Sequence, residues 1–90
     1  MDYIKIGRII NTHGIKGEIK IYPLTDNINR FDDLKTVYLG DNKIKAEVES
    51  VKYHKEMVII KLKEFNNINE VLKFKDDFIY IDQEDRVELP

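Results

Sequence analysis

The sequence predicts an all-β domain, a small closed six-stranded antiparallel β-barrel with one short helix before the last strand. Apolar residues alternate with polar ones through most of the ninety residues, which is the period of a strand and not of a helix. Turn-forming residues separate the alternating runs, and one short stretch has a helix-capping signal. Six short strands joined by tight turns favour a closed barrel, because closure leaves no exposed strand edge.

The first two predicted strands flank a glycine-containing loop. Residues 3–10 form the first strand, and Gly7 within it predicts a bulge, since glycine inside a strand often marks one. Residues 17–22 alternate cleanly and stop at Pro23, which has no N–H for the strand ladder. A polar segment follows, and we expect Phe31 at its end to be a plug under the loop more readily than a base-stacking platform.

The later strands are shorter or irregular. Between Val48 and Val51 the apolar positions change phase, which predicts a bulge near residues 49–50. Residues 57–62 are more continuously apolar, so we expect this strand near the centre of the barrel. The remaining strands are therefore predicted at 37–39, 44–53, 57–62 and 78–81.

One helix is predicted, over residues 68–74. Asn67 can accept a hydrogen bond as the N-cap, and Glu70 stands three residues further on, in the capping-box position. The apolar face of this helix would consist of Ile68, Val71, Leu72 and Phe74.

The side-chain inventory favours a binding protein over an enzyme. The chain has no cysteine, and its two histidines, His13 and His54, are too few and show no ligand spacing that would suggest a zinc centre. Its one serine, Ser50, falls in a predicted strand with no evident histidine and acid partner. Glu18 and Asp26 could be proposed as an acid and base pair, but nothing in the sequence sets their separation. We expect no catalysis, no metal and no cofactor.

Charge is divided unevenly along the chain. The net charge of −2 argues against sequence-independent binding to bare nucleic acid. Residues 1–63 hold twelve Lys and Arg against nine Asp and Glu, whereas residues 64–90 hold three against eight. The basic part could meet a phosphate backbone or an acidic partner, although an evenly solvated surface explains the same numbers. Since no apolar run is long enough to span a bilayer and no signal peptide is evident, we expect a cytoplasmic domain that does not contact a membrane.

The loop at 13–17, with the sequence HGIKG, is the main candidate for a contact surface. Its glycines permit a positive φ, so the simplest interpretation is a hairpin turn. The functional interpretation is that the glycines expose backbone N–H groups beside a lysine and a histidine, which suits docking on RNA phosphate or an acidic protein. The contact candidates are Arg8, His13, Gly14, Lys16, Gly17, Lys20 and Arg30. The strand tyrosines are not assigned to an RNA-stacking surface, because such rings are ordinary at barrel rims.

A family resemblance joins these features. Gly7, the run THGIKGE at 12–18, LTD at 24–26 and RF at 30–31 together resemble the N-terminal domain of the RimM family of ribosome maturation factors. The likeness continues more weakly at 51–55, 66–75 and 79–82. The departures are Val71 and Leu72, where the family usually has alanine and glutamate, and Asp76, where it usually has glycine. These changes concern the packing of the helix.

The resemblance implies a fold and a function. It implies a barrel like the second domains of translation factors, in residues 1–85, with residues 86–90 beginning a linker to a PRC-type barrel outside this chain. It also implies a monomeric, non-catalytic assembly factor that binds the immature 30S subunit, aids maturation of its head and promotes processing of 16S rRNA. The second domain would supply much of the contact to the nineteenth small-subunit ribosomal protein, with 16S rRNA as a further candidate partner.

We therefore expect a ribosome assembly factor domain that acts by binding. The alternative is an OB-like module for single-stranded RNA, which needs a contiguous basic face with exposed aromatic rings. The composition does not favour such a face.

Overall fold

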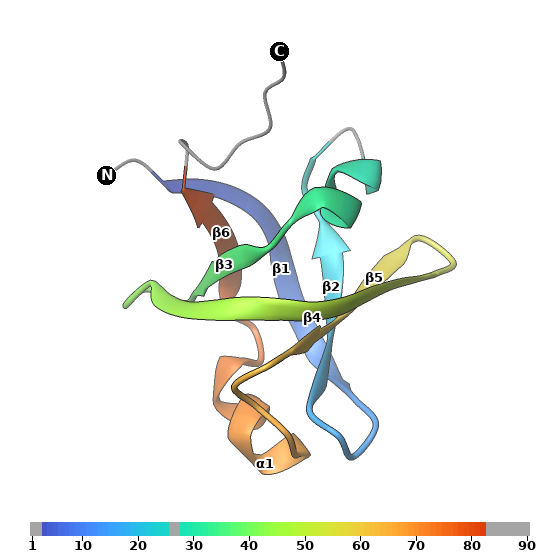
Figure 1. The fold of residues 1–90 in the computed structure, drawn as a ribbon, viewed down its shortest axis with the longest axis vertical. Helices are drawn as coiled ribbons and strands as arrows, with labels where there is room; N and C mark the ends of the chain where they lie inside the picture. The colour runs from blue at the N-terminus through green and yellow to red at the C-terminus, as the bar shows by residue number, and fades with distance from the viewer. Residues whose placement is uncertain (1–2, 26–27, 83–90) are drawn as a thin grey trace.

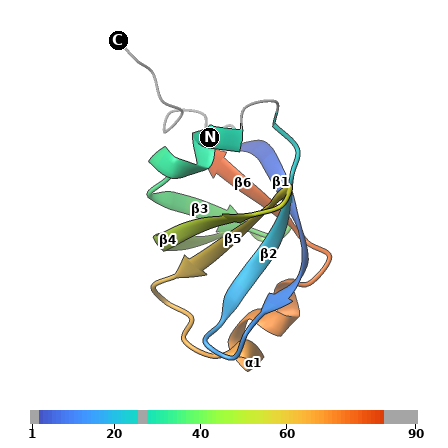
Figure 2. The ribbon, with the colours of Figure 1, turned by 90° about the vertical axis from the view of Figure 1, so that its right-hand side faces the viewer.

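The fold is a ring of six antiparallel strands with a short helical segment at each end (Figures 1 and 2). The computed structural model describes residues 3–25 and 28–82, and for 28–30 the backbone only. The strands are β1 (Tyr3–His13), β2 (Glu18–Pro23), β3 (Thr36–Leu39), β4 (Ile44–His54), β5 (Met57–Leu62) and β6 (Phe78–Asp82). The helical segments are the 3-10 helix η1 (Ile28–Asp33), the α-helix α1 (Ile68–Val71) and the 3-10 helix η2 (Leu72–Phe74).

The strands close into a barrel in the order β1-β2-β5-β4-β3-β6, with β6 paired back onto β1. Every neighbouring pair is antiparallel. The predicted all-β fold, its six strands and the helix before the last strand are confirmed. In Figure 1, α1 lies at the bottom of the barrel and η1 at the top, so the two helical segments close opposite ends.

Bulges bend the two long strands. The register slips between Lys5 and Gly7 against β6, and between Val48 and Ser50 against β5, so both predicted bulges are confirmed. Gly7 also has no room for a side chain, since a Cβ would collide with Ile21 on the neighbouring strand. A third slip, after Ile9 against β2, is not expected from the sequence.

The core fills the barrel with branched aliphatic side chains. Ile6 and Ile9 of β1 and the alternating Ile19 and Ile21 of β2 point inward, and β5 is buried at five of its six positions, in keeping with its continuous apolar pattern. Phe31 on η1 is fully buried and closes one end of the core, as predicted for a plug. The fully buried members of the core include Ile9, Ile19, Ile21, Phe31, Val37, Leu39, Val58, Ile60, Leu62, Val71, Ile79 and Ile81.

The helix before β6 is shorter than predicted. Only Ile68–Val71 is α-helical, and the chain tightens into the 3-10 turn η2 before β6. Asn67 is the N-cap and its side chain accepts from the backbone N–H of Glu70, as predicted. The carboxylate of Glu70 reaches one residue beyond the capping-box position, where it accepts from the N–H of Asn66 at 2.7 Å.

The expected apolar face of this segment is wrong at one position. Leu72 is 47% exposed, whereas Val71 and Phe74 are buried. The physical reason is the change from 3.6 to 3.0 residues per turn, which rotates Leu72 away from the core. The departures from the family pattern at 71 and 72 therefore lie on opposite sides of the segment, one buried and one exposed.

Candidate functional site

The β1–β2 loop is a tight turn whose two glycines have different roles. Both have positive φ, +75° at Gly14 and +92° at Gly17, a region that other residues avoid. Gly14 is exposed, and a Cβ there would be in ordinary contact with the Glu18 carboxylate, at 3.8 Å. Gly17 is buried, and a Cβ there would lie 3.0 Å from the backbone N and O of Asn67 and 3.1 Å from the O of Phe65. Gly17 therefore lets the loop pack directly on the chain that leads into α1.

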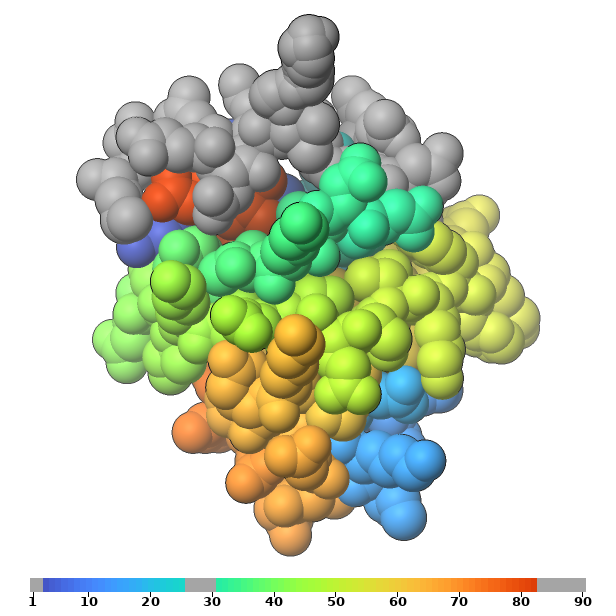
Figure 3. All heavy atoms as spheres, viewed as in Figure 1, coloured from blue at the N-terminus to red at the C-terminus, as the bar shows by residue number. Residues whose placement is uncertain are grey.

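A hydrogen bond completes this attachment. The N–H of Ile68, at the first turn of α1, donates to the carbonyl oxygen of Ile15 at 3.1 Å. The loop backbone thus satisfies one of the N–H groups that a helix start leaves without an internal partner. Figure 3 shows the loop, in blue, lying against the orange helical segment at the bottom of the molecule. One side of the β1–β2 loop therefore packs against the start of α1, and only its other side is available for contact with a partner.

The outward side of the loop carries an apolar and a basic side chain. Ile15 is 79% exposed, and Lys16 beside it is exposed. Lys16 borders a hollow of about 410 Å³ between the loop and β4, into which acids and cations from three strands converge. Its lining residues are Gly14, Ile15, Lys16, Glu18, Glu49, Ser50, Lys52 and Lys61.

The cations of this hollow are of two kinds. Lys52 is largely exposed and pairs with Glu18 across the strands at 3.3 Å. Lys61 is nearly buried, and its ammonium donates to the carbonyls of Leu62 and Phe65 at 2.8 and 2.6 Å. Further contacts of the Lys61 ammonium, with the Asn66 side chain at 3.2 Å and the Glu49 carboxylate at 3.7 Å, hold it in the turn after β5. Lys61 is a structural cation, whereas Lys52 is available at the surface.

The remaining predicted residues are spread over two sides of the barrel. His13 ends β1 opposite Glu18 and lies beside the loop. Lys20 faces outward from β2 towards a second groove, near the β4–β5 hairpin. Arg8 lies elsewhere, because its guanidinium pairs with Asp76 at 3.5 Å on the η2 side of β1. The side chain of Arg30 lies outside the described residues. The structure therefore brings His13, Gly14 and Lys16 together, with Lys20 on the adjoining surface.

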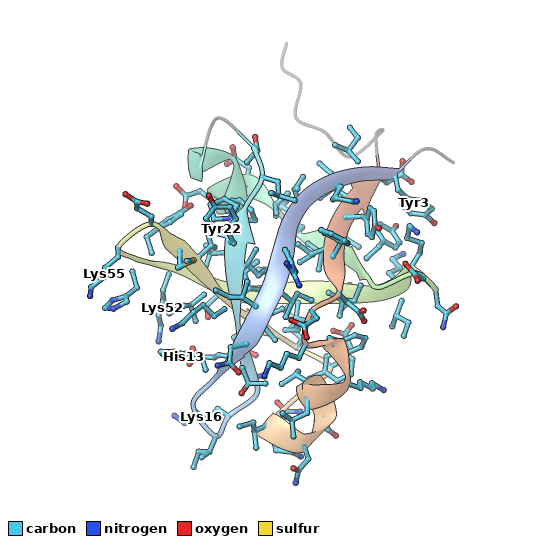
Figure 4. All side chains as sticks on the ribbon, turned by 180° about the vertical axis from the view of Figure 1, so that it is seen from behind. Tyr3, His13, Lys16, Tyr22, Lys52 and Lys55 are labelled. Atoms are coloured by element: carbon cyan, nitrogen blue, oxygen red, sulfur yellow. The ribbon has the colours of Figure 1, made fainter. Side chains whose placement is uncertain are left out.

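Sequence reasoning missed the basic residues of the β4–β5 hairpin. Lys52, His54 and Lys55 are exposed, and Lys55 at the tip has a φ of +59°. Figure 4 shows Lys16, His13, Lys52 and Lys55 along one flank of the molecule. A signal was present, since three basic residues fall within positions 52–55. Their place beside the β1–β2 loop could not be read from the pattern, because it depends on the order of the strands in the closed ring.

One titratable group near this hairpin is clearly shifted. The hydroxyl of Tyr53 donates to the carboxylate of Asp32 on η1 at 2.7 Å. Partial burial, and then this hydrogen bond and the charges of Asp32 and Asp33, raise the pKa of Tyr53 to about 12. The phenol therefore stays protonated at neutral pH and ties β4 to η1.

Residues 3–25 and 28–82 contain neither a candidate metal site nor a candidate membrane-spanning helix. In these ranges no three or more His, Asp or Glu side chains are grouped so that they could hold a metal ion. No helix in the same ranges is long and apolar enough to cross a membrane.

The closed ring and its single short α-helix, within the described ranges, place the chain in the class of small six-stranded β-barrel domains. The pattern of the RimM N-terminal domain matches residues 4–86. The chain belongs to the RimM N-terminal domain family, as its resemblance to that family predicted.

Curated relatives agree with this assignment. The chain is 51% identical over 89 residues to the ribosome maturation factor RimM of Finegoldia magna, and 53% identical over 88 residues to that of Clostridium acetobutylicum. These alignments cover 99% and 98% of the chain but 55% and 52% of the relatives. The chain thus spans about half the length of the curated relatives it matches.

Solved structures show the same fold. A Pseudomonas aeruginosa protein described as a 16S ribosomal RNA processing protein, RimM, superposes with a TM-score of 0.81 at 31% identity, over 99% of this chain and 54% of that one. The N-terminal domain of RimM from Thermus thermophilus superposes with a TM-score of 0.83 over the full length of both chains. The identity to the Thermus domain is 17%, so that likeness supports the fold alone.

Proposed function

We propose that this domain is part of a ribosome assembly factor that binds the immature 30S subunit and acts without catalytic turnover. The observation that carries the proposal is membership of the RimM N-terminal domain family, whose curated relatives are named ribosome maturation factors. The geometry is compatible with it, because the exposed cations of two hairpins lie on one flank of a closed barrel. Such a flank suits a phosphate-rich or acidic particle.

The proposal extends to partners and domain organisation. Residues 1–85 would form the barrel domain, and residues 86–90 would begin the linker to a PRC-type second domain. That second domain would make much of the contact to the nineteenth small-subunit ribosomal protein, while the whole factor would aid head maturation and 16S rRNA processing as a cytoplasmic monomer. The Pseudomonas relative is described as a 16S ribosomal RNA processing protein, which supports this role.

Within the barrel, the proposed contact surface centres on the exposed side of the β1–β2 loop. Lys16 is its leading cation, with His13 beside it and Gly14 shaping the turn. Arg30 belongs to the candidate set through its place in the family motif. Lys20 lies on the adjoining surface and Gly17 supports the loop from beneath, whereas Arg8, although in the candidate set, is held apart by its pair with Asp76.

A chimera tests the proposal. This chain would replace the corresponding first half of the Clostridium acetobutylicum relative in a bacterium that lacks its own RimM. We expect the chimera to co-sediment with immature 30S particles and to lower the amount of unprocessed 16S rRNA. Failure of the unmodified, folded chimera to associate with these particles would contradict the proposed function.

Charge reversal tests the surface. We expect Lys16→Glu combined with Arg30→Glu to weaken association of the chimera with immature 30S particles by about tenfold. The control is Lys35→Glu with Lys45→Glu, which makes the same change of charge at exposed positions near β3 and the start of β4. Equal association of the two double variants would show that the loop surface is not the contact.

A further inference from the structure

A second groove lies on the outer face of the barrel, between β1, β2 and the β4–β5 hairpin. It arises from the unexpected bulge of β1. Ile9 pairs with Ile21 and Asn11 pairs with Lys20, so Ile10 between them has no partner on β2. Ile9 is fully buried, while Ile10 faces the groove together with Met57. The bulge therefore places an apolar side chain outside the barrel, which is a known use of bulges near binding sites.

The groove combines an apolar floor with a basic rim. Its volume is about 510 Å³, within the range of sites that hold small ligands. Lys20, His54 and Lys55 surround the floor, with Glu56 as the one acid among the lining residues. In the ranges 3–25 and 28–82, no carboxylate forms an ion pair with Lys20 or Lys55. These two ammonium groups are thus available to an anion.

The strand register extends this basic surface beyond the groove. Lys20 pairs with Ile59, and Ile59 pairs with Lys52, so the two lysines stand on either side of β5. Neighbouring strands are about 4.8 Å apart, which places these two positions roughly 10 Å from one another. Ile59 between them is only 4% exposed, since long lysine stems can cover an apolar neighbour. Lys52 also pairs with Glu18. The pair reduces the positive charge that Lys52 presents to an anion, but the Lys52 side chain stays exposed.

An exposed aromatic ring lies on the same face. Tyr22 is two residues after Lys20 on β2 and points to the same side of the sheet. It is 48% exposed, and continuing the register from the pair Ile21 and Val58 brings it next to Met57. In Figure 4 Tyr22 lies on the same half of the molecule as Lys52 and Lys55. The ring therefore borders the apolar floor of the groove.

This combination fits a nucleic acid better than a peptide. Extended peptides commonly bind by adding a strand to a sheet edge, and the closed ring leaves no edge to extend. A basic surface with an aromatic ring and an apolar recess is the arrangement that holds single strands, since the bases stack and the phosphates meet cations. A duplex keeps its base faces inside the helix, so it could use the lysines but not the ring or the recess.

We propose that the groove at Ile10 and Met57, bordered by Tyr22, Lys20, Lys52 and Lys55, binds a single-stranded segment of RNA. One base enters the recess or stacks on Tyr22, and the adjoining phosphates meet the lysines. The inference deepens the proposed function by naming the chemistry of one contact, and it rests on that function for its biological setting. It supplies the contiguous basic and aromatic face that composition alone did not reveal.

The test measures binding of the ninety-residue chain to a fluorescent uridine RNA of about twelve nucleotides, the length scale of one small barrel's site. Fluorescence anisotropy is recorded between about 50 and 200 mM salt. Three phosphate contacts on a single strand predict a slope of log K against log salt of about −2. We expect Lys20→Glu with Lys55→Glu to reduce the slope to about −0.7 and to weaken binding at least tenfold.

Matched variants separate charge from stacking. Tyr22→Ala should weaken binding roughly tenfold with little change in slope, while Tyr22→Phe keeps the ring and should bind as the unmodified chain does. Lys35→Glu with Lys45→Glu repeats the charge change away from the groove and should have a smaller effect. Circular dichroism confirms that each variant is folded.

The outcomes that overturn the inference are distinct from failure of the proposed function. Equal loss of affinity in the two double-lysine variants, or tighter binding of an RNA hairpin duplex or a poly-glutamate peptide, would show that the groove is not a single-strand site. If the chain binds no RNA but the chimera still associates with immature 30S particles, the RNA inference fails and the function stands. If RNA binds at the groove but the chimera does not associate, the function fails alone.

Discussion

Two hairpins project from one flank of the barrel, and they are held in place by different means. The β1–β2 loop is attached by backbone, through the close approach of Gly17 to Asn67 and the hydrogen bond from Ile68 to Ile15. The β4–β5 hairpin is tied by a side chain close to its turn, through the bond from Tyr53 to Asp32, and its tip residues are exposed. Figure 3 shows the second hairpin, in yellow, above the blue loop on the same side.

The difference between the two hairpins shows how the conspicuous HGIKG motif should be interpreted. The glycines that make the first loop prominent in the sequence serve the turn and its packing, and Gly17 in particular has no exposed face. The second hairpin has no glycine, yet it places Lys55 at the tip with a φ of +59°, a conformation in which glycine would cost less. The HGIKG motif is therefore needed for the turn and its packing at least as much as for contact with a partner. Part of the basic flank comes from the β4–β5 hairpin, which no such motif marks.

The largest expected effect comes from detaching the first loop. Gly17→Ala forces a Cβ against backbone atoms of Phe65 and Asn67 and strains a residue with φ of +92°. We expect the free energy of unfolding to fall by about 2–4 kcal/mol, measured by urea denaturation. The matched control is Gly14→Ala, whose Cβ makes only an ordinary contact with the Glu18 side chain and which should cost about 1 kcal/mol for backbone strain. Equal costs at the two positions would contradict the packing role of Gly17.

A smaller effect is expected from the cation beneath the loop. Lys61→Met preserves most of the stem but removes the ammonium that Leu62 and Phe65 accept from. Loss of these bonds removes the ammonium from the carbonyl of Phe65 and leaves the carbonyl of Leu62 with the longer bond from the Phe65 N–H, at 3.3 Å, so stability should fall by about 1–3 kcal/mol. Hydrogen exchange at the Ile68 amide should also accelerate, because the segment after β5 positions the start of α1. Lys63→Met, at an exposed neighbouring position, serves as the control and should change stability by less than about 0.5 kcal/mol.

The smallest effect concerns the tether of the second hairpin and depends on pH. The pKa of Tyr53 is raised to about 12 from its ordinary value of 10.0, so the folded state favours the protonated phenol. The stabilisation is present below about pH 10 and is lost as the pH rises towards about 12, because ionisation removes the donor and sets a charge beside Asp32.

Tyr53→Phe isolates this contribution. The ring is 40% exposed, so the variant should lose less than about 1 kcal/mol at neutral pH. The difference in stability between the unmodified chain and the variant should shrink between pH 10 and 12, followed by urea denaturation at each pH. A difference that stays constant over that range would show that the bond to Asp32 does not stabilise the fold.

The fold was largely predictable because its signals are local. The alternation of β2, the continuous apolar run of β5 and the N-cap at Asn67 each depend on residues close in sequence. The predictions fail at two places where the backbone departs from a regular helix or strand for a few residues. Leu72 is placed on a buried face when an α-helix is extended through a 3-10 turn, and the bulge at Ile10 carries no glycine to mark it.

The candidate site was predictable only in part. The HGIKG loop could be found, because glycines and a basic residue in a turn form a recognisable local pattern. Its attachment to α1 could not, since Gly17 and Asn67 meet only when the barrel and helix are assembled. Nor could the separation of Arg8 from the other cations be foreseen, as it depends on the approach of Asp76 to β1.

The sequence by itself determined the class of fold, the positions of the six strands and the family, because periodicity, turn chemistry and motif spacing are written along the chain. Tertiary structure decided which side chains share a surface. Lys20 and Lys52 are neighbours across β5 because the ring order places β5 between β2 and β4. Register between distant strands depends on the closure of the whole barrel and on its bulges, and a one-residue slip would send every side chain of a strand to the other face.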